Sequence, residues 1–228
     1  MLKPFSFNVA DFPKVVFGPG TVGAVGVETA RWGRRAFVLT GKGSARRTGV
    51  LQRVLSSLEE QNLVVDVFEG IEPNPRLETL RAAAEQARRF DAEVVVAVGG
   101  GSTMDAAKGL TTELAYPGQM WDFVLRGAQT RTPEKSLPIV TVPTTAATGS
   151  ETNATGVITW WERHEKMPLV NPAALPKVAI MDPELTLTLP WETTLAGAAD
   201  ILAHLLETYI PSPEVEPQDS FTEGSFRA

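Results

Sequence analysis

The sequence contains no cysteine among its 228 residues. This absence excludes disulfide bonds, thiolate metal ligands and a cysteine nucleophile, and it fits a reducing compartment. Histidine is also scarce, because only His164 and His204 are present. A site that depends on several imidazole groups therefore has few candidates in this chain.

Positive charge is in deficit as well, since the formal net charge is -6 at pH 7. A nucleic-acid partner needs a basic surface that neutralises phosphates, so the charge balance argues against one. No apolar run approaches the roughly 20 residues of a membrane-spanning helix, and the first residues lack the apolar core of a secretory signal. We therefore expect a cytoplasmic protein with small-molecule partners, without nucleic-acid or membrane association.

What the chain does contain is a repeated alternation of strand-like and helix-like segments. Such β-α units predict an α/β fold with a doubly wound, mostly parallel sheet and helices on both faces. Segments 5–7 and 14–17 predict a β-hairpin ahead of it, and an all-helical domain is expected to begin near Pro190. The predicted strands are 35–40, 63–68, 94–98, 137–142, 154–161 and 177–181, and the predicted helices are 21–30, 46–61, 77–90, one ending near 115, and 190–210.

The most informative segment is the strand 94–98 followed by Gly99, Gly100, Gly101 and Ser102. Glycines allow backbone N–H groups to approach an anion closely, and a helix start adds unpaired donors and the positive end of a dipole. This pattern predicts a phosphate-binding turn. The alternative is an ordinary strand-to-helix turn without a ligand.

A second glycine junction follows strand 35–40, but neither junction has the full G-x-G-x-x-G dinucleotide pattern. Gly41 occupies the place where an acidic residue would bind a ribose 2′-hydroxyl, and Lys42, Arg46 and Arg47 could pair with a 2′-phosphate instead. The junction, which also includes Ser44, therefore favours NADP(H) over NAD(H). Alternatively, its basic residues are simply solvent-exposed side chains of a surface helix.

Residues 143–153 form a hydroxyl-rich segment after strand 137–142. This segment follows a strand at the predicted sheet edge where open α/β sheets bind ligands, and its hydroxyl groups could hydrogen-bond a ribose or a nicotinamide amide. The same composition is typical of an ordinary turn.

Asp200 and His204 stand four residues apart in a predicted helix, so they share one face, as two metal ligands must. A surface or helix-packing pair is the alternative. However, the surrounding run 195–206 is otherwise apolar, and an unpaired carboxylate there would be costly. His164 lies in a charged segment and is expected to be exposed.

Three segments, 99–108 (GGGSTMDAAK), 143–151 (PTTAATGSE) and 197–207 (GAADILAHLLE), together resemble the iron-containing (group III) alcohol dehydrogenases. Segments 17–20 (FGPG), 70–75 (GIEPNP) and 48–50 (TGV) look most similar to the NADP-dependent, butanol-dehydrogenase-like aldehyde reductases of that family. The resemblance implies a Rossmann-like dinucleotide-binding domain over residues 1–188. Residues 189–228 would then be the first part of a helical metal-binding domain.

The resemblance also implies site residues. The pyrophosphate would be held by Gly100, Gly101 and Ser102, with Asp105 beside them. The cofactor would further contact Thr144, Thr145, Thr148, Asn74 and Lys166. Asp200 and His204 would be the first two ligands of a divalent metal, iron in the family, with zinc or manganese also compatible.

One departure stands out, because the family binds its metal through one Asp and three His, whereas no histidine follows His204. The chain is therefore expected to be C-terminally truncated. We predict an NADP-preferring oxidoreductase of small alcohols or aldehydes, impaired in this chain, and the resemblance suggests a homodimer with paired edge strands near the N-terminus. The alternatives are a catalytically silent nucleotide-binding fragment and, disfavoured by segment 143–151, a metal-dependent lyase or synthase that uses NAD transiently.

Overall fold

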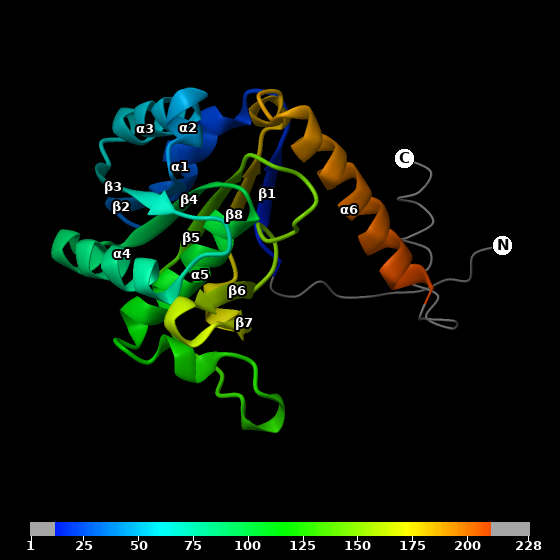
Figure 1. The fold of residues 1–228 in the computed structure, drawn as a ribbon. Coiled ribbons are helices and arrows are strands. Elements are labelled where there is room, and N and C mark those ends of the chain that lie inside the picture. The colour runs from blue at the N-terminus through cyan, green and yellow to red at the C-terminus, as the bar shows by residue number, and fades with distance from the viewer. Residues whose placement is uncertain (1–11, 211–228) are drawn as a thin grey trace, which may run out of the picture.

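The computed structural model describes residues 12–210, which are built around a six-stranded sheet (Figure 1). The strands run in the order β1, β8, β5, β4, β2, β3, and every neighbouring pair is parallel. The predicted doubly wound parallel sheet is therefore confirmed. The bounds are β1 (Lys14–Phe17), β2 (Arg35–Gly41), β3 (Val64–Ile71), β4 (Val94–Gly99), β5 (Ile139–Pro143) and β8 (Val178–Met181).

The order of the strands reverses between β2 and β4, because the chain goes outward from β2 to β3 and then crosses back to β4. At such a switch point the carboxyl ends of the strands leave a crevice for ligands. At the far edge, β1 pairs in parallel with β8. The other strand of the predicted N-terminal hairpin, 5–7, lies outside the described residues.

The central strands are buried on both faces. In β2, Phe37 and Leu39 belong to the core beneath α4 (Leu77–Phe90) and α5 (Gly101–Ala115). Ala36 and Val38 belong to the opposite core beneath α1 (Val25–Thr29) and α3 (Val50–Glu60). All four side chains are fully buried. This two-sided burial explains why the strands read as continuous apolar runs rather than alternating ones.

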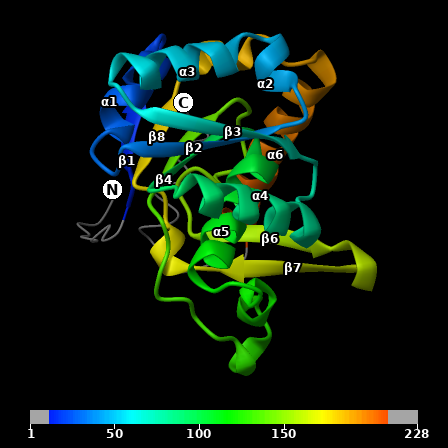
Figure 2. The same ribbon diagram turned by 90° about the vertical axis from the view of Figure 1, so that its left-hand side faces the viewer.

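Helices cover both faces of the sheet, with α1, α2 and α3 on one side and α4 and α5 on the other (Figure 2). The α-helices are α1 (Val25–Thr29), α2 (Ser44–Arg47), α3 (Val50–Glu60), α4 (Leu77–Phe90), α5 (Gly101–Ala115) and α6 (Trp191–Tyr209). Short 3₁₀ helices are η1 (Thr21–Ala24), η2 (Met120–Phe123), η3 (Gly127–Gln129), η4 (Trp161–Arg163), η5 (Pro172–Ala174) and η6 (Pro183–Thr186).

The helix predicted over 46–61 is divided into α2 and α3. Gly49 has a φ of 77°, a left-handed conformation that glycine adopts without strain and that ends helical progression. The apolar face predicted for this segment is nevertheless buried through Val50, Leu51, Val54 and Leu58. The division changes where the helix begins but not which face packs on the sheet.

Two further strands, β6 (Thr155–Trp160) and β7 (Glu165–Val170), form a separate antiparallel hairpin beside α5. The segment 154–161 was predicted as a strand, but β7 was not predicted. Its charged start resembles a surface loop, and pairing with β6 makes it a strand. His164 lies in the turn between the two strands, where its φ is 54°. Its side chain is exposed, as predicted.

The last described helix, α6, extends away from the sheet rather than covering it (Figure 1). Several of its large apolar side chains are exposed, among them Trp191, Leu195, Leu202 and Leu206. The helix itself confirms the prediction that a helical region begins near Pro190. Across residues 12–210, no helix combines the length and the apolarity that crossing a bilayer would take.

Candidate functional site

Site residues predicted from three separate segments meet at one edge of the sheet. Gly41 ends β2, Gly99 ends β4 and Pro143 ends β5, and these strands are neighbours in the sheet. Because parallel strands place their carboxyl ends at the same edge, the loops after them lie together. We refer to residues 99–102 as the glycine turn and to residues 143–153 as the hydroxyl loop.

The hydroxyl loop lies directly against the glycine turn. A Cβ on Gly100 would stand 3.0 Å from Thr145 Oγ1, and one on Gly101 would stand 2.9 Å from Thr148 Cγ2. A Cβ at either position would force the neighbouring threonine to shift, so glycine permits this close approach of the loop. Since α5 begins at Gly101, the first N–H groups of a helix, which lack intrahelical acceptors, are available at this cradle.

Two further predicted cofactor contacts join the glycine turn. The backbone N–H of Asn74 donates to Ser102 Oγ at 3.2 Å. Lys166 Nζ, from β7, donates to Asn74 Oδ1 at 2.7 Å. The structure therefore brings Asn74, Ser102 and Lys166 together, although 92 residues separate the first from the last in the sequence.

The Gly41 junction has room for a side chain that the sequence does not supply. A Cβ on Gly41 would stand 3.5 Å from the nearest atom, the carbonyl oxygen of Ile71, which is an ordinary contact. Glycine is thus not required by packing at this position. Ser44 begins the short helix α2, and its Oγ would lie 3.9 Å from that Cβ.

The basic residues of this junction differ in their pairing. Arg46 donates from Nε and Nη2 to both carboxylate oxygens of Glu69, at 2.6 to 3.0 Å, and this hydrogen bonding holds the pKa of Glu69 below its usual range. Lys42 is well exposed, and its Nζ lies 3.9 Å from Glu72 Oε2. Lys42 is therefore freer than Arg46 to reach a phosphate, a distinction that the sequence alone did not reveal.

Asp105 faces the protein rather than open solvent. Its Oδ1 accepts from Ser150 Oγ at 2.6 Å, and its Oδ2 accepts from the backbone N–H of Val157 at 3.0 Å. Next to it, Lys108 is fully buried. Burial lowers the pKa of Lys108 to about 8, against the opposing influence of Asp105 and Glu151.

Lys108 is the last residue of the motif 99–108, but no role was predicted for it from the sequence. The available signal was a lysine placed among small and apolar residues, three positions after an aspartate and therefore on the same helix face.

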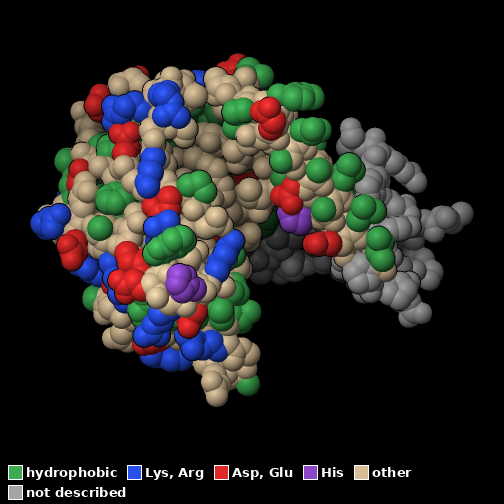
Figure 3. All heavy atoms as spheres, in the orientation of Figure 1, with side chains coloured by type: hydrophobic (Ala, Val, Ile, Leu, Met, Phe, Trp, Pro, Cys, Tyr) green, Lys and Arg blue, Asp and Glu red, His purple; other side chains and the backbone are tan. Residues whose placement is uncertain are grey.

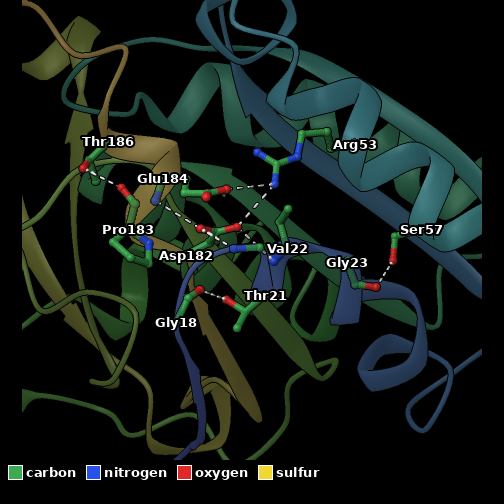
Figure 4. Close-up of polar contacts among 11 residues, drawn as sticks. Gly18, Thr21, Val22, Gly23, Arg53, Ser57, Asp182, Pro183, Glu184 and Thr186 are labelled. Atoms are coloured by element: carbon green, nitrogen blue, oxygen red, sulfur yellow. Dashed lines mark hydrogen bonds and ion pairs between the residues drawn. The ribbon is translucent and has the colours of Figure 1, made fainter.

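A second buried charge, Asp182, was also missed, and Figure 4 shows why it needs no ligand. Its carboxylate accepts from the backbone N–H groups of Gly20, Val22 and Glu184 at 3.0 to 3.2 Å, and it lies 3.5 Å from Arg53 Nη2. A buried carboxylate with this many donors is satisfied. Asp182 therefore fastens the end of β8 to the turn after β1 and is a structural group.

The predicted metal ligands Asp200 and His204 do lie on one face of α6, with Asp200 Oδ2 3.9 Å from His204 Nδ1. Both side chains are about half exposed, at 50% and 54%. In the part of the chain that the structure describes, no cluster of three or more His, Asp or Glu side chains is arranged to hold a metal ion. The pair has suitable chemistry but too few ligands for a complete site.

A groove of about 570 Å³ lies between the hydroxyl loop and α6. The hydroxyl loop contributes Thr145 and Thr148 to one wall, and α6 contributes Gly197 and Asp200 to the other. Figure 3 shows the surface hollowed between the α/β body and α6, with hydrophobic side chains gathered along that helix. The hydroxyl loop and Asp200 thus border one groove, and the glycine turn lies against the same loop.

The fold and the site together define a class of protein: a doubly wound α/β domain of the kind that binds nucleotides at its switch point, followed by the start of a helical region. Residues 13–183 match the family model for iron-containing alcohol dehydrogenase. The chain belongs to that family, which confirms the resemblance identified in the sequence.

Individual relatives agree with this assignment. NADH-dependent butanol dehydrogenase A of Clostridium acetobutylicum is 35% identical over 223 residues, which cover 97% of this chain and 57% of that protein. NADPH-dependent aldehyde reductase YqhD of Escherichia coli is 33% identical over 222 residues, or 96% of this chain and 56% of that protein. The chain therefore spans about half the length of these relatives.

Among solved structures, the crystal structure of NADH-dependent butanol dehydrogenase A from Thermotoga maritima superposes with a TM-score of 0.88. It is 36% identical in sequence, and the match covers 97% of this chain and 55% of that one. Such agreement over nearly all of this chain includes α6 as well as the sheet.

Proposed function

We propose that this chain binds NADP(H) for hydride transfer to or from a small alcohol or aldehyde, with NAD(H) as a weaker alternative cofactor. The observation that carries the proposal is the glycine turn enclosed by the hydroxyl loop. Backbone N–H groups at Gly100, Gly101 and Ser102 suit the pyrophosphate. The named relatives, a butanol dehydrogenase and an aldehyde reductase, support the substrate class.

The remaining predicted residues have consistent places around such a dinucleotide. Thr144, Thr145 and Thr148 would orient the half of the cofactor that carries the nicotinamide, since Thr144 is bonded to Gly99 and the other two line the groove. Asn74 and Lys166 would contact it from the side of β7. Asp105 would act from beneath by supporting Ser150 and Val157. The cofactor itself, when bound, supplies or accepts the hydride.

The Gly41 junction supports the proposed preference for NADP(H). The space beside Gly41 leaves a 2′-phosphate unopposed, whereas an aspartate there would repel it. Lys42 is freer than Arg46 to reach the phosphate, because Arg46 is held by Glu69. A domain boundary near residue 188 would separate this cofactor half from the helical region.

Metal binding is expected to be weak in this chain. A divalent ion such as iron, zinc or manganese suits an aspartate and a histidine, but a stable site in a protein normally needs three or four ligands. We therefore infer that Asp200 and His204 alone support little turnover. The competing hypothesis is a nucleotide-binding module that is catalytically silent.

The proposal is tested by titrating the chain with NADPH and with NADH and measuring binding through the fluorescence of the reduced nicotinamide. We expect stoichiometric NADPH binding that is about tenfold tighter than NADH binding, which corresponds to one good charge-assisted contact. Absence of NADPH binding would overturn the proposal. Reduction of butyraldehyde with added iron(II), zinc or manganese then separates a weak enzyme from the silent module.

A further inference from the structure

Lys108 is the buried cation that the proposed function does not use. It lies in the second turn of α5, fully buried, and its Nζ contacts four acceptors. These are Ser150 O and Ser150 Oγ at 2.8 Å, Asn153 Oδ1 at 2.9 Å and Thr155 O at 2.7 Å. An ammonium has three N–H donors, and the four acceptors all lie within residues 150–155. All the donors of Lys108 are therefore used on one segment of the chain.

That stretch is the second half of the hydroxyl loop and the start of β6. The neighbouring carboxylate of Asp105 completes the attachment, because it accepts from Ser150 Oγ and from the N–H of Val157. Asn153 relays the contact further, since its Oδ1 also accepts from the N–H of Thr155 and its Nδ2 donates to Gly149 O. The loop is thus held to α5 by charge-assisted bonds at several points.

The first half of the same loop carries the threonines that enclose the glycine turn. Its start is fixed by one backbone bond, from the N–H of Thr144 to Gly99 O at 2.9 Å. Between the two fixed ends, Ala147 has a φ of 82°, a conformation that a residue with a Cβ adopts only when its surroundings impose it. The glycine turn begins α5, so α5 carries both the cradle and the attachment of the loop above it.

We propose that Lys108 is a positioning residue: it fastens the hydroxyl loop to α5 and thereby sets the gap between Thr145, Thr148 and the glycine turn. This inference rests on the proposed function, because the gap matters only if a dinucleotide occupies it. Lys108 touches no part of that cradle itself. Its effect passes through Ser150 and Asn153.

The test is Lys108→Met, which keeps the length of the side chain and removes its donors, with Lys135→Met at an exposed site as the matched control. Amide hydrogen exchange without ligand should rise in residues 144–155 of Lys108→Met and stay unchanged in β2 and β4. NADPH should bind about tenfold more weakly, the loss expected for a charge-assisted bond, while 2′,5′-ADP, which lacks the nicotinamide half, should lose less than about twofold. A residue that merely stabilises the fold would weaken both ligands equally.

The inference is overturned if Lys108→Met folds and either binds NADPH like the unmodified protein or loses both ligands to the same degree. Unchanged exchange in residues 144–155 would overturn it as well. If Lys108→Met does not fold, Ser150→Ala decides, because it removes one acceptor of Lys108 and the donor to Asp105. That variant should show the same selective loss for NADPH, and equal losses would count against the inference. Failure of the unmodified protein to bind NADPH would instead refute the proposed function, while the exchange measurement would still test the attachment.

Discussion

Helices α5 and α6 each carry an acidic and a basic residue one turn apart, yet the two pairs differ in almost every other respect. On α5, Lys108 is fully buried and Asp105 is half-buried, and both hydrogen-bond to Ser150. On α6, Asp200 and His204 are about half exposed, and the atoms nearest each other are 3.9 Å apart. Sequence spacing is similar, but only one pair is built into a hydrogen-bonded network.

The difference separates two kinds of functional residue. A buried and fully bonded pair fixes the position of other groups, because moving it would leave polar atoms unsatisfied. An exposed pair keeps its lone pairs available for a ligand, but two ligands hold a metal poorly. Within the described residues, the α5 pair is therefore part of a hydrogen-bonded network, whereas the α6 pair supplies only two of the ligands that a metal ion would need.

The largest contrast is expected in packing. Leu110→Ala on α5 should lower the free energy of unfolding by about 2–5 kcal/mol, because Leu110 is fully buried and its removal leaves a cavity. Leu202→Ala on α6 should cost less than about 0.5 kcal/mol, since 53% of that side chain is already exposed. Urea denaturation of both variants measures the two values. Similar losses for the two variants would contradict the exposed position of Leu202 on α6.

The burial of Lys108 should also change how the stability of the protein depends on pH. The pKa of Lys108 is lowered from 10.5 to about 8, so between these values the unfolded chain binds more protons than the folded one. The stability of the unmodified protein relative to Lys108→Met should therefore be constant below about pH 8 and rise above it. Over the whole window the rise should be about 3 kcal/mol.

The charged groups that act on Lys108 are Asp105 from α5 and Glu151 from the hydroxyl loop, and both oppose the lowering of its pKa. Denaturation curves of the two proteins at pH 7 to 10.5 supply the comparison. A relative stability that falls as pH rises would contradict the assigned direction.

A smaller effect is expected on cofactor choice at the Gly41 junction. Gly41→Asp should weaken NADPH binding about tenfold and leave NADH binding the same or tighter, because a carboxylate repels a 2′-phosphate and can accept from a 2′-hydroxyl. Gly41→Asn adds nearly the same volume without charge and should change NADPH binding less. Equal losses in both variants, measured by fluorescence titration, would show that volume rather than charge decides.

The smallest effect is expected at the exposed pair. The double variant Asp200→Asn with His204→Gln should bind NADPH within about twofold of the unmodified protein, because a surface pair contributes little to local structure. Its affinity for zinc, measured by competition with a chromogenic chelator, should fall. A large loss of NADPH affinity would show that α6 helps to form the cofactor site.

Local patterns predicted most of the fold. Helix α4 and strand β4 follow directly from apolar spacing and from a run of valines, and the glycine turn was recognised from its residues alone. The break at Gly49 was missed because it depends on a backbone conformation that many glycines do not adopt. Strand β7 was missed because its partner β6, rather than its own composition, makes it a strand.

The candidate site was predictable where one segment supplies the chemistry and less so where distant residues meet. The pairing of Arg46 with Glu69 spans 23 residues, and Lys108 reaches partners 42 to 47 residues away. Such contacts depend on how the elements pack, so spacing along the chain does not reveal them. They decide which cations remain free for a ligand and which support the structure.

The most direct test of a cofactor half built on the glycine turn is calorimetric titration of NADPH into Gly101→Ala, beside Gly23→Ala. A Cβ on Gly101 would stand 2.9 Å from Thr148, whereas one on Gly23 would have no neighbour within 4 Å. We expect NADPH to bind stoichiometrically to the unmodified protein and to Gly23→Ala. In Gly101→Ala, its affinity should fall at least tenfold, about 1.4 kcal/mol. Equal affinity in all three proteins would contradict it.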